Sequence, residues 1–286
     1  MARSFVAVIA LSVTSMACRP AVLTQQVDAR RVAADLHLQF TKAADAADRA
    51  VMADADEASA KAAREAEDAS KAVERDLKEL RPLLESLGYG DELRFLGTFE
   101  ERFAEYRKLD EEILPLAVEN SNLKAQRLSF GPAREAAAEF RQSLDAAVRA
   151  APSANACSAD ALAARAVVAL LEIQVLHAPH IAEAEDAAMT RMEAQMVAAE
   201  TTVRRALDDL KQSIGSKASA QLTAASAAFD RFEDINGQIL VLSRRNSDVR
   251  SLALSLGQKR MVTAVADDQL RGLEEALAKH GFTGTR

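Results

Sequence analysis

The strongest constraint on the fold of this chain is an internal repeat. Residues 112–131 align without a gap with residues 238–257, and the alignment extends from Phe103/Phe229 to Arg134/Arg260. About ten of roughly 32 positions are identical, where unrelated segments would share about two. The identical pairs include Ile113/Ile239, Leu114/Leu240, Leu116/Leu242, Asn120/Asn246, Ser121/Ser247, Leu128/Leu254 and Gly131/Gly257. The sequence therefore predicts a tandem duplication of a unit roughly 130 residues long.

The composition predicts that this unit is helical. Hydrophobic residues make up 49% of the chain and charged residues 28%, with only 10 Gly and 6 Pro in 286 residues. Abundant alanine with few helix breakers is typical of long helices that pack along narrow seams of small residues. We therefore expect an all-α fold of two tandem antiparallel four-helix bundles.

The predicted domain boundaries follow the repeat. Residues 18–150 form the first four-helix bundle and residues 159–286 the second, with a polar linker at residues 151–158 that contains Pro152. The Asn-Ser pair that follows the third helix of each unit is predicted to be a turn. The alternative, that the two units share long helices, is left open by the sequence.

The start of the chain is typical of an export signal. Residues 1–17 combine the positive charge of Arg3 with a short apolar run and a small-residue end before Cys18. The signal resembles the lipobox of bacterial lipoproteins, which implies a lipidated Cys18 and an envelope protein anchored to a membrane. Ser15 departs from the aliphatic residue that the lipobox prefers. Two alternatives are ordinary cleavage with a free Cys18, and a disulfide between Cys18 and Cys157.

The net charge limits the class of partner. The chain carries a formal charge of −7, and removal of residues 1–17, whose only charge is Arg3, makes it −8. An acidic chain is a poor match for nucleic acid or an anionic membrane surface. We therefore expect no nucleic-acid partner.

The seam of the third helix in each unit resembles the four-helix-bundle sensor domain of methyl-accepting chemotaxis proteins. The resemblance is carried by the Asn-Ser turn, by the Leu-Ser-x-Gly segment, and by Phe103, Tyr106, Asp110, Ile113 and Leu116 with Phe229, Phe232, Asn236, Ile239 and Leu242. It implies an extracytoplasmic bundle that binds small molecules or partner proteins. The sequence shows no transmembrane or signalling segment after the bundles, so we expect a different chain, a membrane receptor, to supply transduction if signalling is the role. Self-association is the other expected protein contact.

Two polar residues occupy matching positions in the predicted seams. Asp110 and Asn236 are costly to bury without a partner or water. They are weak candidates for lining a ligand cavity, and the alternative is a hydrogen bond that fixes the register of the helices.

His177, His180 and Glu183 are weak candidates for metal ligands. Their spacing places all three on one face of a helix, where copper or zinc needs a further ligand from another helix. The favoured alternative is an exposed histidine pair beside Pro179. Nearby methionines are expected to fill gaps in the core rather than bind copper.

No motif in the sequence predicts catalysis or a cofactor, and we expect no enzyme activity. Two functions remain as hypotheses. The first is an exported sensor-like binding protein, and the second is a structural or oligomeric envelope lipoprotein without a ligand. Metal binding is a minor third hypothesis.

Overall fold

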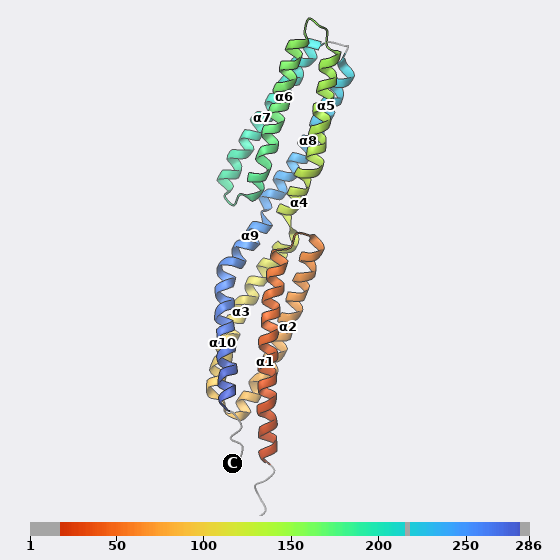
Figure 1. Ribbon diagram of the computed structural model, residues 1–286. Helices are drawn as coiled ribbons and strands as arrows, with labels where there is room; N and C mark the ends of the chain where they lie inside the picture. Colours follow the sequence, from red (N-terminus) through yellow and green to blue (C-terminus); the bar gives the residue numbers. More distant parts are fainter. Residues whose placement is uncertain (1–17, 215–217, 281–286) are drawn as a thin grey trace, which may run out of the picture. The chain divides into compact units, whose positions relative to one another are not determined.

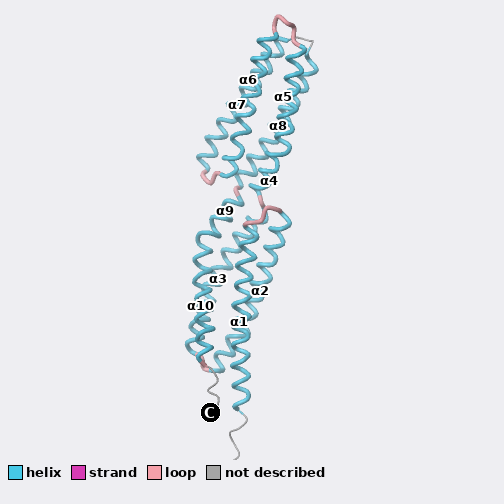
Figure 2. The backbone as a smooth tube through the Cα atoms, in the orientation of Figure 1, coloured by secondary structure: helices cyan, strands magenta, loops and turns pink. Residues whose placement is uncertain are grey.

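A computed structural model describes residues 18–214 and 218–280 of the chain, and these residues are helical without any strand (Figures 1 and 2). The prediction of an all-α fold built from helical bundles is therefore confirmed. The predicted signal peptide, residues 1–17, lies outside the described residues.

The helices are long because Gly and Pro, the strongest helix breakers, are scarce, at 10 and 6 of 286 residues. Pro82, Pro115 and Pro179 lie within helices, near the end of each. The helices in chain order are α1 (Cys18–Val51), α2 (Asp56–Leu87), α3 (Gly90–Glu119), α4 (Ser121–Leu128), α5 (Arg134–Ala150), α6 (Ala156–Ala182), α7 (Asp186–Ile214), α8 (Ser219–Arg245), α9 (Ser247–Leu254) and α10 (Arg260–Lys279). Two π-helical turns, η1 (Ser129–Ala133) and η3 (Ser255–Lys259), join α4 to α5 and α9 to α10.

The chain forms two compact units that are interleaved along the sequence. Unit 1 consists of residues 1–48, 64–110 and 258–286, and unit 2 of residues 49–63 and 111–257. The fourth helix of the first repeat, α4 to α5, therefore belongs to unit 2, while most of the fourth helix of the second repeat belongs to unit 1. The predicted domains, residues 18–150 and 159–286, differ from these units because the repeats have exchanged their fourth helices.

Unit 1 is a bundle of α1, α2, α3 and α10 with an aromatic core. Phe40 on α1 meets Phe99 and Tyr106 on α3 in edge-to-face contacts, each with ring centroids 5.3 Å apart. Such pairs stabilise a core beyond the area they bury. His37 Nε2 on α1 donates a 2.8 Å hydrogen bond to the carboxylate of Asp267 on α10, which fixes α10 to this unit.

Unit 2 has its main core between α5, α6, α7 and α8, which run side by side in Figure 1. Phe140 on α5 and Phe229 on α8 are fully buried, with ring centroids 5.7 Å apart. Alanines such as Ala166 on α6 and Ala225 on α8 supply the small-residue seams that the composition predicted, and they allow the helices to pack closely.

The Asn-Ser turn of each repeat meets its counterpart inside unit 2. Asn120 and Asn246 adopt left-handed backbone conformations, with φ of 49° and 54°, which asparagine tolerates better than most residues. The backbone N–H of Ser121 donates to Ser247 Oγ at 2.9 Å, and the N–H of Ser247 donates to Ser121 Oγ at 3.0 Å. This reciprocal pair, which we call the serine node, holds the two ends of residues 121–247 next to each other.

Candidate functional site

A row of buried polar side chains crosses the core of unit 2. Ser129 Oγ lies 3.0 Å from His177 Nδ1, and His177 Nε2 lies 2.9 Å from Asn236 Oδ1. The amide nitrogen of Asn236 donates to Glu200 Oε1 at 3.0 Å. The row therefore connects η1, α6, α8 and α7, and it ends at a half-buried carboxylate.

The geometry of this row fixes how His177 is protonated. Asn236 Oδ1 is an acceptor, so Nε2 of His177 carries a proton and Nδ1 accepts the hydroxyl proton of Ser129. Burial lowers the pKa of His177, with the hydrogen bond that His177 donates to Asn236 acting in the opposite direction. A neutral imidazole satisfies every bond of the row, so the two observations agree.

A second row lies close to the first in sequence and ends at an ion pair. His180 Nδ1 lies 2.8 Å from Ser243 Oγ, and His180 Nε2 lies 3.0 Å from Glu193 Oε1. Arg244 binds both oxygens of Glu193, at 2.7 and 2.8 Å. The hydrogen bond from Arg244 lowers the pKa of Glu193, with His180 contributing in the same direction. Although serine, histidine and a carboxylate occur together here, Ser243 and His180 are fully buried, so a substrate has no access to them.

The prediction that the histidines form an exposed pair is wrong. His177 and His180 are 1% and 0% exposed. They continue the buried face of α6 beyond Ile173 at spacings of four and three residues, which is the helical period of a core seam. This spacing was the signal that the sequence analysis missed.

The structure does not bring Glu183 together with the two histidines. Glu183 follows the last turn of α6 in extended backbone, and its carboxylate accepts the N–H groups of Ala184 and Glu185. Among the described residues, no group of three or more His, Cys, Asp or Glu side chains is placed to hold a metal ion. Met189 and Met196 are buried in the core of unit 2.

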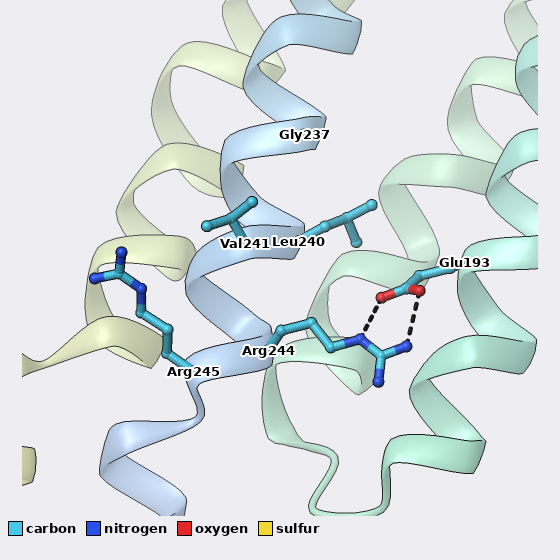
Figure 3. A pocket seen from close by; sticks show the side chains of 6 residues that line it. All are labelled: Glu193, Gly237, Leu240, Val241, Arg244 and Arg245. Atoms are coloured by element: carbon cyan, nitrogen blue, oxygen red, sulfur yellow. Dashed lines mark hydrogen bonds and ion pairs between the residues drawn. The ribbon is translucent and has the colours of Figure 1, made fainter.

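An open groove lies beside the second row. It has a volume of about 610 Å³ and is lined by Glu193 on α7 and by Gly237, Leu240, Val241, Arg244 and Arg245 on α8. Figure 3 shows Arg244 reaching across from α8 to Glu193, with the apolar side chains of Leu240 and Val241 on the adjoining turn of α8. The groove therefore combines an apolar wall with an ion pair that is connected to buried His180.

The seam of unit 1 holds an ion pair instead of a histidine row. Lys259 Nζ lies 2.5 Å from Asp110 Oδ1, and both side chains are 2% exposed. The ammonium also lies 4.8 Å from the centroid of the Tyr106 ring. Burial raises the pKa of Asp110 despite the opposing charge of Lys259, and burial together with Asp110 raises the pKa of Tyr106 well above its ordinary value.

The two polar seam residues therefore have different partners. Asp110 pairs with Lys259 in unit 1, and Asn236 bonds to His177 and Glu200 in unit 2. The second carboxylate oxygen of Asp110, Oδ2, and the hydroxyl of Tyr106 have no hydrogen-bond partner among the described residues. Sequence reasoning missed Lys259, although it aligns with Ala133 in the repeat and so places a charge at a seam position.

Two features bear on membrane attachment. Helix α1 begins at Cys18, whose side chain lies outside the described part of the structure, and Cys157 is an exposed free thiol. Of the described helices, α6 alone has the length and apolar composition needed to cross a membrane, and 33% of its most apolar window is buried. Length and composition are weak evidence for a membrane span, and α6 also carries both buried histidines.

No protein-family model and no curated protein sequence matches this chain.

Proposed function

We propose that the chain is an exported, lipid-anchored binding protein that senses a small molecule through unit 2 and docks on a membrane partner, without turnover. The observation that carries this proposal is the groove beside Arg244 and Glu193, since it places a bidentate ion pair next to both solvent and the buried row of His180.

The polar rows support a role beyond stability. Replacing buried polar and ionic groups with apolar residues of similar size is often neutral or stabilising. A bundle with a purely structural role would therefore gain little from His177 and His180 in its core. Hydrogen-bonded networks instead fix one arrangement of helices, here that of α7 against α6 and α8.

The ion pair offers a way for a ligand to change that arrangement. The side chain of Arg244 is 30% exposed at the edge of the groove. An acidic ligand group bound there competes with Glu193 for the guanidinium, which has a fork geometry suited to carboxylates. Release of Glu193 alters its bond to His180, and a docked partner can read the resulting small helix shift.

The second candidate function is docking or self-association without a ligand. It is favoured by an apolar stripe on the outer face of α6, where Val168, Leu171 and Val175 are 55%, 45% and 72% exposed. Exposed apolar patches of this kind mark interaction surfaces when they are contiguous. This stripe accounts for a partner but not for the polar rows of unit 2.

A thermal-shift screen of the mature chain against amino acids, organic acids and aromatic acids tests the proposal. A ligand at 100 times its dissociation constant adds about 2.7 kcal/mol to stability. Arg244→Gln should abolish the shift of a compound that binds in the groove beside Arg244. Arg204→Gln is the matched control, because Arg204 also bridges α7 and α8, through Glu233, but does not line the groove. If no compound shifts the melting temperature and crosslinking in cells recovers only copies of the chain, the sensor proposal fails and the structural alternative replaces it.

A further inference from the structure

We propose that a second groove of unit 2, between α5 and α6, is a binding site for a small organic carboxylate with an apolar body. The groove has a volume of about 260 Å³. Its lining includes two arginines, Arg134 and Arg141, one neutral polar residue, Gln174, and otherwise apolar side chains. It shares no lining residue with the groove beside Arg244, so the inference goes beyond the proposed function.

The two arginines are placed to act on one ligand. They are seven residues apart on α5, which is two helical turns and about 10 Å along the axis, on the same face. Ala137 and Ala138 lie between them in the lining, and these small side chains leave space over the helix surface. Two flexible guanidinium groups can therefore reach a common anionic group above the alanines.

The charges of these arginines are unmatched within the described part of the chain. Arg134 and Arg141 form no hydrogen bond or ion pair with any described residue, and no acidic residue lines the groove. Arg204, Arg231 and Arg244 of the same unit, by contrast, each bind a carboxylate, on Glu233, Glu139 and Glu193 respectively. The side chains of Arg134 and Arg141 are exposed, so both guanidinium groups are accessible to an anion from solution.

The remaining lining selects the body of the ligand. Phe140 and Leu170 are buried at the base of the groove, and Leu171 is exposed at its edge. An apolar group that covers the exposed side chain of Leu171 and the half-buried side chain of Val167 gains the free energy of removing them from water. Gln174 adds one hydrogen-bonding group without charge. The volume is below the range typical of drug-sized ligands, so a single ring or a short branched chain fits best.

Titration calorimetry of the mature full-length chain with benzoate and with 3-methylbutanoate tests this site. We expect one site per chain, and we expect benzyl alcohol, which keeps the ring and lacks the charge, to bind at least about tenfold more weakly. Arg134→Gln and Arg141→Gln should each weaken benzoate binding about tenfold. Arg149→Gln is the matched control, because Arg149 is exposed on the same helix outside the groove and should leave binding unchanged.

A further variant and a cross-check keep the test independent of the groove beside Arg244. Leu171→Glu places an anion at the groove and should abolish binding while both arginines remain. Arg244→Gln should leave benzoate affinity unchanged. The proposal is overturned if neither acid binds at millimolar concentration, if the Arg134→Gln/Arg141→Gln double variant with wild-type helix content binds as tightly as wild type, or if Arg244→Gln alone removes binding.

Discussion

Removal of Lys259 should destabilise unit 1 strongly, because it strands a buried carboxylate. Lys259 and Asp110 are both 2% exposed and 2.5 Å apart. Loss of one partner from a buried ion pair costs about 3–5 kcal/mol, because the remaining charge has no compensation. Lys259→Met keeps most of the volume of the side chain, so the cost reports the lost charge rather than a cavity. For a chain of this size, this cost corresponds to a fall in melting temperature of about 6–20 °C.

The double variant Asp110→Leu/Lys259→Met separates the charge from the packing. Replacement of both members of a buried pair by apolar residues is often neutral or stabilising, so this variant should lie within about 1 kcal/mol of wild type or above it. The cost of Lys259→Met alone should shrink as the pH falls towards the raised pKa of Asp110, because protonation of the carboxyl removes the stranded charge.

The assay follows unit 1 specifically. The chain has two tyrosines and no tryptophan, and both tyrosines, Tyr89 and Tyr106, lie in unit 1. The midpoint of urea unfolding by tyrosine fluorescence therefore reports this unit. Lys78→Met is the control, since Lys78 is exposed on α2 and should change stability by less than about 0.5 kcal/mol. A cost below about 1 kcal/mol for Lys259→Met, or a double variant as unstable as the single one, would refute the reasoning.

Four further predictions address pH, folding and anchoring. The pKa of His177 in the folded chain is lowered from 6.5, so the unfolded chain binds more protons at this residue. The free energy of unfolding should therefore fall as the pH drops below about 6.5. His177→Gln should reduce this pH dependence in thermal melts followed by circular dichroism. Residues 121–247 should melt cooperatively as an isolated fragment, because they contain the main core of unit 2 and the serine node joins their ends. Cleavage within residues 151–158 should leave neither half with a cooperative melt, since each half lacks its exchanged fourth helix; two cooperative halves would contradict this topology. Cys18→Ser should release the protein from membranes, whereas a soluble wild-type chain with an unmodified Cys18 by mass spectrometry would exclude the lipid anchor.

The sequence was sufficient for the helices and for the repeat, but not for the exchange of fourth helices. Seam residues of the two fourth helices are alike, as in Leu128/Leu254 and Ser129/Ser255. Periodicity alone therefore does not choose which bundle each of these helices joins. The choice depends on contacts between residues distant in sequence, such as the bond of His37 to Asp267.

The candidate sites were only partly predictable, because the partners of the seam residues also lie far away in the sequence. Asp110 and Asn236 stood out because polar residues at seam positions need partners. Their partners could not be predicted from local patterns. Lys259 lies 149 residues from Asp110, and His177 was expected to be exposed. The groove of Arg134 and Arg141 depends on which helix packs beside α5, which no local pattern specifies.

Native mass spectrometry of the mature chain, isolated from its own cell envelope, tests the central claim most directly. The account predicts a population of chains that carry one noncovalent small molecule, whose mass disappears when the chain is unfolded while the covalent lipid mass on Cys18 remains. If every chain has only its covalent mass, and if no amino acid, organic acid or aromatic acid at millimolar concentration produces an adduct, the claim that this protein binds a small molecule is contradicted.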